Sequence, residues 1–576
     1  MLVIKRQLRY HGNLNVESEF APSSGNPIMK LLEFFNRELE ISKSSILGST
    51  TIAGAASAVL LAVINSGAEM AANQEMKDHY FWIFIASFLL FFITKKFALS
   101  AASVAVEAAV RKVRIRIADK IRRSELSFVE NMGRSSMFTR LTQDANLISQ
   151  SAVIIINASQ SAIVLVTTLI YVAWLSPVGF LIITVALCTG SILYLANNRK
   201  NADAFEAVNR KESEFFDALN HLLSGFKEVK VNTKKSDRLF EHIERISEET
   251  EQLKVTSGLR FVVDFMFSQV SFYLLLAIIV FILPQLEPTH YTIVIKLTAS
   301  TLFIIGPVNL LVGAIPIFTL ADVAVRNLYK LESELDAQGL SDQPFNVRLA
   351  NRMAAFQEIR FENVTFAYDA KESGGEFSVG PLNFFIKRGN ILFLTGGNGS
   401  GKSTVLKVIT GLYYPVSGRI LIDSVPVNRA NYPEFRNLFS LIFSDFHLFD
   451  RLYGLEDVDE DTLDELLRLM QLENKTSYQD GHFTDINLST GQKKRLAFIA
   501  ATLEDKPINI FDEWAADQDA TFRAFFYEKI LPDMRARGKT LICVTHDDRY
   551  FHECDHLIKM EMGKVVIDDD HAGTTA

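Results

Sequence analysis

Cysteine is scarce in this chain. Its 576 residues include only Cys188, Cys543 and Cys554, and no CxxC pair or Cys/His spacing occurs. This pattern argues against a disulfide framework and against a structural zinc site. Three isolated thiols are also compatible with a catalytic part that works in a reducing compartment.

An excess of positive charge and a secretion signal are missing as well. The chain has 59 Lys and Arg against 67 Asp and Glu, a formal net charge of −8. Electrostatic binding of nucleic acid is therefore not expected. Residues 1–27 contain no apolar run followed by a small-residue cleavage site, so we predict a polar cytoplasmic tail without a signal peptide.

Long apolar runs are abundant in the first half of the chain. Six of them have the length needed to cross roughly 30 Å of hydrocarbon. They are Ser44–Ser66, Tyr80–Ala102, Ser151–Leu175, Val178–Ala196, Phe261–Ile282 and Tyr291–Phe318. A single run of this kind also fits a buried helix of a water-soluble protein, but six in succession predict an all-α transmembrane domain over residues 28–336.

Basic residues are unevenly distributed between the connections of these spans. The segments after the second and fourth spans carry nine and twelve Lys or Arg, whereas the other three connections carry Lys77 alone. Cytoplasmic connections are the ones enriched in Lys and Arg, so both long segments and both termini are predicted to be cytoplasmic.

Apolar residues recur at helical spacing inside these long segments, for example Leu219, Leu222 and Phe226. We therefore predict membrane helices that continue into the cytoplasm and turn near Ser127–Gly133 and near Arg210–Phe216. Such turns could contact a domain beneath the membrane, and solvated hairpins without a partner are the alternative.

The last third of the chain has a different pattern. After a breaker-rich stretch, assigned to a linker over residues 337–352, short β-rich runs alternate with helical segments. The runs are IRFENVTFAY, FFIKR, ILFLT, RILID, INIFDE and LICVTH. Alternation of this kind predicts an α/β domain with a parallel sheet over residues 353–576.

The run ILFLT leads into a glycine-rich segment that then opens a helix. The segment satisfies G-x-x-x-x-G-K-[ST] in a strand–loop–helix context, which predicts a phosphate-binding loop. Backbone N–H groups of such a loop surround phosphate oxygens, the lysine holds the β- and γ-phosphates, and the serine hydroxyl binds Mg²⁺. The residues are Gly396, Gly397, Asn398, Gly399, Ser400, Gly401, Lys402, Ser403 and Thr404.

Two carboxylates end the apolar run INIFDE. Asp512 is placed to hold Mg²⁺, and Glu513 is placed to polarise the water that attacks a phosphoryl group. An apolar run followed by two acidic residues is common by itself, so this prediction depends on the phosphate loop upstream.

A third motif, Leu488-Ser489-Thr490-Gly491-Gln492, lies between the other two. Its serine hydroxyl and glycine N–H could contact phosphate at a helix N-terminus. Without the neighbouring motifs, an ordinary helix N-cap is the preferred interpretation.

With these three motifs in this order, the chain resembles an ATP-binding-cassette exporter half-transporter, a six-helix transmembrane domain fused to a P-loop NTPase nucleotide-binding domain. The resemblance implies a homodimeric ATPase that uses ATP and Mg²⁺, with Ser489, Gly491 and Gln492 meeting the ATP bound by Lys402 of a second copy. It also implies that Tyr368 stacks on adenine, that His546 lies near the γ-phosphate, and that Asp519 crosses the dimer interface. Edge packing for Tyr368 and a solvated loop for His546 are the alternatives.

Several positions depart from the usual exporter pattern. Ser444 stands where a glutamine is usual, Thr490 replaces a glycine, and Trp514 replaces a proline. The stretches FSDFHLFDRLYG, LSTGQKKRLAFIAA and FDEWAADQD are similar to a bacterial subgroup that exports cyclic peptides and peptide siderophore precursors. That resemblance implies a peptide-like cargo, an inner-membrane location in contact with lipid, and periplasmic or outer-membrane export partners. A lipid or glycolipid flippase and an ATP-dependent sensor without cargo are the alternatives.

Polar side chains within membrane spans are costly and often face a cavity. The candidates for a substrate path are Glu107, Asp264, Gln269, Lys296 and Asn309. For Lys296 the alternative is a side chain that reaches the outer interface, and for Glu107 it is a solvated cytoplasmic position.

Overall fold

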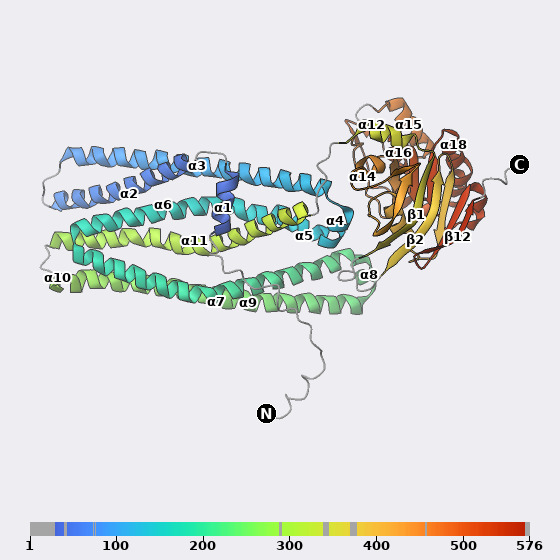
Figure 1. The fold of residues 1–576 in the computed structure, drawn as a ribbon. Coiled ribbons are helices and arrows are strands. Elements are labelled where there is room, and N and C mark those ends of the chain that lie inside the picture. Colours follow the sequence, from blue (N-terminus) through green and yellow to red (C-terminus); the bar gives the residue numbers. More distant parts are fainter. Residues whose placement is uncertain are drawn as a thin grey trace, which may run out of the picture. The chain divides into compact units, whose positions relative to one another are not determined.

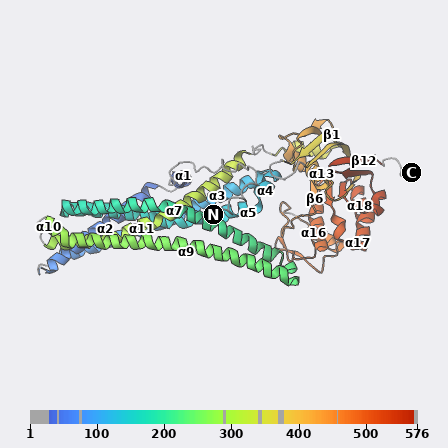
Figure 2. The ribbon, with the colours of Figure 1, turned by 90° about the horizontal axis from the view of Figure 1, so that it is seen from below.

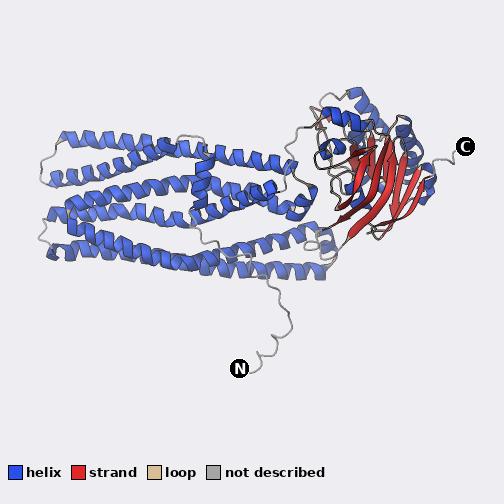
Figure 3. Cartoon of the chain, viewed as in Figure 1, coloured by secondary structure: helices blue, strands red, loops and turns tan. Residues whose placement is uncertain are grey.

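The computed structural model describes residues 29–39, 43–72, 74, 77–286, 291–337, 345–368, 377–455 and 458–570. The chain divides into two compact units. Residues 1–116 and 138–330 form the membrane unit, and residues 117–137 and 331–576 form the nucleotide unit (Figure 1). The described strands lie in the nucleotide unit, and the membrane unit is helical (Figure 3). The predicted tail, residues 1–27, lies outside the described residues.

Long helices contain all six predicted spans. They are α2 (Lys43–Ala72), α3 (Asp78–Arg123), α6 (Ala145–Leu175), α7 (Pro177–Ser224), α9 (Thr233–Ala277) with the π-helical turn η2 (Ile278–Ile282), and α11 (Tyr291–Ala337). Five of the six regions are long and apolar enough to cross a membrane, and the sixth, in α7, has a shorter apolar part at Pro177–Ile192. The short helices of the membrane unit include α1 (Met29–Glu38), η1 (Arg140–Asp144), α8 (Phe226–Val231) and α10 (Leu283–Leu286), and the division between the two units at residue 137 falls inside α5 (Arg134–Thr139).

A cluster of buried aliphatic side chains joins α6, α7, α9 and α11. Val172, Ile183, Leu275 and Leu297 are among its members. Along their length α7 and α9 pack against each other, and Figures 1 and 2 show the two helices side by side. In contrast, large side chains of α3 such as Trp82 are exposed, as expected for a surface that meets lipid acyl chains.

The membrane helices continue beyond their apolar parts, as predicted. The predicted turn at Ser127–Gly133 is confirmed, because α4 (Leu126–Met132) ends at Gly133 with φ +78°. The turn predicted at Arg210–Phe216 is wrong, since these residues lie inside α7. The chain turns later, at α8 (Phe226–Val231), because Gly225 ends α7 and the Asn232 side chain caps α9 by accepting the Lys235 N–H at 3.0 Å.

Two sheets form the frame of the nucleotide unit. A four-stranded antiparallel sheet has the order β2 (Ser378–Lys387), β1 (Glu358–Ala367), β4 (Ser417–Ile422) and β5 (Val425–Pro426). A six-stranded sheet has the order β12 (Lys564–Asp570), β11 (His556–Glu561), β3 (Ile391–Gly396), β10 (Thr540–Val544), β9 (Ile508–Asp512) and β6 (Phe439–Ile442). Five of its strands, β11 to β6, are parallel, which confirms the predicted parallel sheet, and β12 is antiparallel.

Helices cover the six-stranded sheet and produce two apolar cores. One core packs α13 (Lys402–Ile409) and α14 (Tyr432–Arg436) between the two sheets. The other core packs the helices α15 (Glu460–Leu469), α16 (Thr490–Leu503), α17 (Ala520–Phe525) and α18 (Leu531–Ala536) and the turns η3 (Trp514–Asp517), η4 (Phe526–Ile530) and η5 (Asp548–Glu553) against the sheet. A two-residue hairpin, β7 (Tyr478–Gln479) and β8 (His482–Phe483), lies before α16.

The predicted linker, residues 337–352, is described only in part. Its second half forms most of α12 (Val347–Ala354), an amphipathic helix whose Met353 belongs to the core between the sheets. The Asn346 N–H also donates to Glu434 Oε1 at 2.7 Å. Residues 345–354 are therefore part of the folded nucleotide unit.

Candidate functional site

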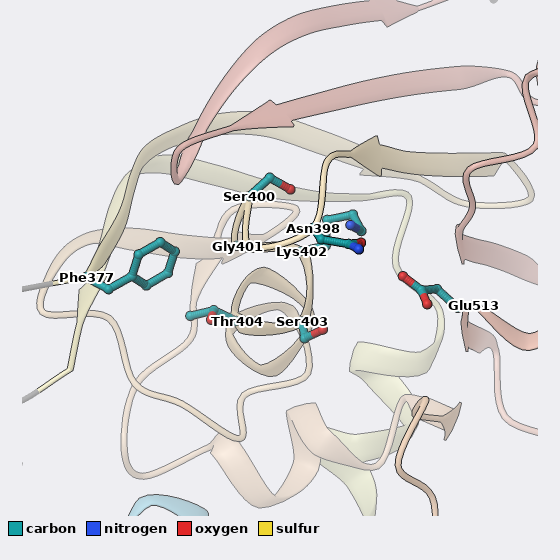
Figure 4. Close-up of a pocket in the computed structure, with 9 residues that line it drawn as sticks. Phe377, Asn398, Ser400, Gly401, Lys402, Ser403, Thr404 and Glu513 are labelled. Atoms are coloured by element: carbon teal, nitrogen blue, oxygen red, sulfur yellow. The ribbon is translucent and has the colours of Figure 1, made fainter. Parts of the chain in front are cut away.

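The phosphate-binding loop runs from the end of β3 to the start of α13. Gly396 has φ +147°, and a Cβ there would lie 2.3 Å from the Met560 carbonyl oxygen. Gly401, the residue before the helix, has φ +100°. Only glycine adopts such conformations without strain, so the loop can curl tightly before it enters α13, as the ribbon in Figure 4 shows.

Lys402 is buried beneath this loop. Its Nζ donates to the carbonyl oxygens of Gly396 at 2.9 Å and Gly397 at 3.1 Å. The Ser400 hydroxyl is buried too, and within the described residues it has no hydrogen-bond partner. A positive charge and an unpaired hydroxyl in one loop suit an anionic ligand, since each can be satisfied by phosphate oxygens.

A pocket of about 270 Å³ adjoins the loop. Figure 4 shows Phe377 and Glu513 on opposite sides of the phosphate loop. The lining residues are Phe377, Asn398, Gly399, Ser400, Gly401, Lys402, Ser403, Thr404 and Glu513. The structure thus brings the predicted loop and the predicted general base into one site.

Asp512 ends the buried strand β9 and is only 2% exposed. Its Oδ2 accepts the Ser444 N–H at 3.3 Å, and burial raises the pKa of this carboxyl above its ordinary value. Because Ser444 makes this contact through its backbone, the replacement of the usual glutamine does not remove it. A nearly buried carboxylate and the Ser403 hydroxyl are hard oxygen donors, the kind of ligand that suits Mg²⁺.

Glu513 directly follows Asp512 but has a different backbone conformation. Its φ of 49° and ψ of 34° are left-handed, which is uncommon for a residue with a side chain. Glu513 lines the pocket, and its Oε1 lies 3.2 Å from His546 Nε2. The imidazole and the carboxylate predicted to act on the γ-phosphate are therefore neighbours.

The LSTGQ motif forms the N-terminus of α16. Ser489 and Gln492 make a reciprocal capping box, in which Ser489 Oγ accepts the Gln492 N–H at 3.4 Å and Gln492 Oε1 accepts the Ser489 N–H at 3.1 Å. Among the described residues, those that line the pocket include neither Ser489 nor Gly491. Within one chain, the described lining of this pocket therefore comes from the phosphate loop, Phe377 and Glu513 and not from the motif.

Asp519 is the N-cap of α17, the helix after η3. Its Oδ1 accepts the Phe522 N–H at 2.9 Å, and its Oδ2 forms an ion pair with Arg495 at 3.1 Å. The backbone hydrogen bond from Phe522 holds the pKa of Asp519 below its ordinary value. Asp519 is exposed, so it remains available to a second copy.

Tyr368 lies beside the pocket without lining it. Its ring packs edge-on against Phe366 and Tyr413, with centroid separations of 5.2 and 5.8 Å, and its hydroxyl is 3.1 Å from Thr404 Oγ1. The aromatic side chain that lines the pocket is Phe377. Sequence reasoning did not identify Phe377, because nothing in the pattern distinguishes it from the other 43 phenylalanines of the chain.

Two carboxylates, which sequence reasoning also missed, fasten the turn helix α4 to the rest of the nucleotide unit. Glu125 accepts hydrogen bonds from the Tyr414 hydroxyl at 2.6 Å and from Arg436 at 2.7 Å. Glu130 forms an ion pair with Lys407 at 2.8 Å and accepts a hydrogen bond from the Tyr413 hydroxyl. Burial, followed by the bond to Glu125, raises the pKa of Tyr414 to about 12. Since Lys407 lies on α13, these contacts connect α4 to the helix that follows the phosphate loop.

The predicted substrate-path residues do not form one cluster in the described part of the chain. Lys296 pairs with Glu69 at 2.6 Å, and Glu107 accepts a hydrogen bond from Ser149. Asn309 follows Lys296 by 13 residues on the same helix, a separation of about 20 Å at the rise of an α-helix. Gln269 is half-buried on α9, and the side chain of Asp264 lies outside the described residues.

Comparisons with known proteins agree with this architecture. Residues 46–305 match the model of the ABC transporter transmembrane region, and residues 379–516 match the model of the ABC transporter. The chain therefore belongs to the ABC transporter family, as an exporter half-transporter with a transmembrane domain ahead of a nucleotide-binding domain and an ATPase activity coupled to transport.

One curated relative resembles the chain over nearly its full length. This is the ATP-binding protein SyrD of Pseudomonas syringae pv. syringae, which is 32% identical over 527 residues, 90% of this chain and 92% of SyrD. The mycobactin import ATP-binding/permease protein IrtB of Mycolicibacterium thermoresistibile is 30% identical over 253 residues, 42% of each chain. The solved structure of a bacterial Atm1-family ABC exporter with ATP bound has a TM-score of 0.74 at 16% identity, covering 92% of this chain and 95% of that one. At this identity, the last comparison shows the shared fold alone.

Proposed function

We propose that two copies of this chain form an ATP-driven exporter of a cyclic or otherwise modified peptide in a bacterial inner membrane. One observation supports the proposal that two copies form a dimer. Among the described residues, the Ser489–Gly491 turn does not line the pocket with Lys402 in its own chain, although both suit phosphate. Each ATP therefore lies between the phosphate loop of one copy and the Ser489–Gly491 turn of the other.

The site residues have distinct roles in this proposal. The loop from Gly396 to Thr404 holds the phosphates, and Lys402 exchanges its two carbonyl partners for phosphate oxygens. Ser403 and Asp512 hold Mg²⁺, which offsets charge on the phosphates when it is bound. Tyr368 or Phe377 supplies the aromatic surface for adenine, and Asp519 meets the second copy.

Glu513 acts as the general base for hydrolysis. It accepts a proton from water as the water oxygen bonds to the γ-phosphorus and the bond from that phosphorus to the ADP oxygen breaks. His546, 3.2 Å away, orients the carboxylate. The backbone contact between Ser444 and Asp512 keeps the loop after β6 close to the acidic pair without a glutamine.

The peptide cargo rests on the resemblance of three stretches around Ser444, Ser489 and Glu513 to exporters of cyclic peptides and peptide siderophore precursors. Mycobactin in the name of a relative is compatible with a cargo of the siderophore class. Periplasmic or outer-membrane components would then receive the cargo. The basic residues of the two long connections support cytoplasmic termini and a cytoplasmic nucleotide-binding domain.

The test is transport by the full chain in inside-out vesicles. Short labelled cyclic peptides and a labelled lipid are supplied in parallel with ATP, and Lys402→Ala vesicles provide the background. ATP-dependent peptide uptake at least fivefold above that background is expected. A response to the lipid alone would replace the peptide exporter by a flippase. If the protein hydrolyses ATP but deletion of its gene leaves cellular peptide efflux unchanged, the result would favour an ATP-dependent sensor.

A further inference from the structure

Three polar contacts join helix α16, which begins with the LSTGQ motif, to the segment after β9, which begins at Glu513. Lys494, on α16, donates from Nζ to the Glu513 carbonyl oxygen at 2.7 Å and forms an ion pair with Asp517 at 2.7 Å. In return, the Trp514 indole Nε1–H donates to the Lys494 carbonyl oxygen at 2.8 Å. We call these contacts the Lys494–Trp514 clasp.

The clasp is buried at its centre. Lys494 is 3% exposed and Trp514 is 1% exposed, in a cluster of rings that includes Phe498, Phe511 and Phe526. A buried ammonium group is stable only with charged or carbonyl acceptors, and both acceptors here belong to the segment that begins at Glu513. The clasp therefore fixes the backbone of Glu513 in its left-handed conformation, from which the carboxylate faces the pocket.

Further contacts extend the clasp to the motif at the start of α16. Gln518 Nε2 donates to the Gly491 carbonyl oxygen at 3.0 Å, and Arg495 Nε donates to Gln518 Oε1 at 2.8 Å. Gly491 is also close to this segment, since a Cβ there would lie 2.8 Å from the Asp517 carbonyl oxygen. One hydrogen-bonded block thus contains both the Ser489–Gly491 turn and the carboxylate of Glu513.

We propose that Lys494 is a positioning residue that ties Glu513 to the helix carrying Ser489 and Gly491. This inference rests on the proposed dimer, in which the turn meets the ATP of the partner and Glu513 serves the ATP of its own chain. The turn and the carboxylate move together because the clasp joins them. Trp514 contributes an N–H donor that the proline usual at its position in the family lacks.

The chain offers a matched control at the other end of β9. Lys539 Nζ donates to the carbonyl oxygens of Asp505 and Lys506, both at 3.0 Å, and pairs with the Asp505 carboxylate at 2.6 Å. Asp505 is also left-handed, with φ 50°. Lys539 thus repeats the contact pattern of Lys494 at residues that do not line the pocket.

The first test measures ATP hydrolysis by the full chain in lipid nanodiscs. Lys494→Met is expected to lower kcat at least tenfold and to change KM for ATP less than threefold, because the loop that binds ATP is intact. Lys539→Met is expected to keep kcat within twofold. Trp514→Phe keeps an aromatic ring and loses the donor, and a fall of about threefold is expected. A kcat within twofold of the parent for Lys494→Met would overturn the proposal, and so would an equal loss in Lys539→Met.

The second test separates positioning from a general packing defect. Mixed dimers are purified through two different tags, with Glu513→Gln in one copy so that one base remains. Lys494→Met in the copy that retains Glu513 is expected to lower hydrolysis tenfold or more, whereas the same change in the Glu513→Gln copy is expected to lower it less than threefold. Equal losses in both arrangements would sink the proposal. Absence of ATP hydrolysis by the dimer without substitutions would instead contradict the proposed function.

Discussion

The nucleotide unit and the membrane unit bury charge in different places. In the nucleotide unit the buried charges include Lys402, Lys494 and Asp512, which surround the phosphate loop and the acidic pair. In the membrane unit the buried carboxylates include Glu38 and Asp322, which fasten α1 to α3 and α11. Buried charge therefore serves architecture in both units, at Glu38 and Asp322 and also at Glu434, whereas in the nucleotide unit it surrounds the candidate site as well.

This difference explains what each unit reveals about function. A site for phosphate needs fixed donors, so its residues are few, specific and recognisable. A cavity for an apolar or peptide-like cargo can be lined by ordinary apolar side chains, which are equally suited to packing or to lipid contact. The nucleotide unit identifies the reaction, and the membrane unit leaves the cargo open to experiment.

The largest expected effect is at the acidic pair. Glu513→Gln removes the proposed general base and should lower kcat for ATP hydrolysis by about 100-fold or more, while ATP still binds. Fluorescent-nucleotide titration and phosphate release measure the two quantities on the same nanodisc sample. Glu504→Gln is the control, since that carboxylate lies at the C-terminal end of α16, where it accepts a hydrogen bond from Ser440 on β6. Hydrolysis at the parental rate would remove Glu513 from this role.

A smaller effect is expected where α4 is held by the rest of the nucleotide unit. Glu125→Gln weakens charge-assisted bonds to Arg436 and Tyr414, which are worth about 1.5–3 kcal/mol each. Amide hydrogen exchange of residues 126–132 should then accelerate by about tenfold. Glu362→Gln breaks a pair with Arg419 at the protein surface and should leave that exchange unchanged, because exposed pairs contribute about 0–1 kcal/mol. Unaltered exchange in both variants would mean that other contacts hold α4.

The sequence alone predicts those features that depend on residues close together in the chain. The phosphate loop, the strand before Asp512 and the turn at α4 depend on glycines, β-rich runs and helix breakers within a few residues. The second turn was misplaced because Arg210–Phe216 contains charged residues but no breaker, whereas Gly225 ends the helix.

Features that depend on distant partners could not be predicted in this way. Arg436 is 311 residues from Glu125, and Lys494 is 19 residues from the carbonyl that it binds. No spacing rule connects such positions, so each carboxylate or lysine reads as an ordinary surface charge. Phe377 is a similar case, because only the packing of β1 and β2 places its ring at the pocket.

A test of the architectural role of charge in the membrane unit is Asp322→Ala. Asp322 Oδ1 accepts the N–H groups of Lys30 and Leu31 at 3.1 and 3.0 Å, and therefore caps α1. Loss of this cap should destabilise the protein by about 1–2 kcal/mol and lower Tm, with kcat per folded molecule within twofold. Asp237→Ala, at an exposed position on α9, should change stability by less than about 0.5 kcal/mol. A large fall in kcat at unchanged Tm would show that α1 takes part in the ATPase cycle.

The smallest effect is expected at Lys296. Its pair with Glu69 at 2.6 Å is partly exposed, with side chains 18% and 34% accessible, so a double-mutant cycle of Lys296→Met and Glu69→Gln should give a coupling below about 1 kcal/mol. The pair joins α2 and α11 near the ends that the basic residues of the chain assign to the non-cytoplasmic side. Both hydrolysis and peptide uptake should therefore stay within twofold of the parent. If Lys296→Met abolishes uptake while hydrolysis continues, the lysine belongs to the substrate path, and the membrane unit, like the nucleotide unit, uses a charge for function.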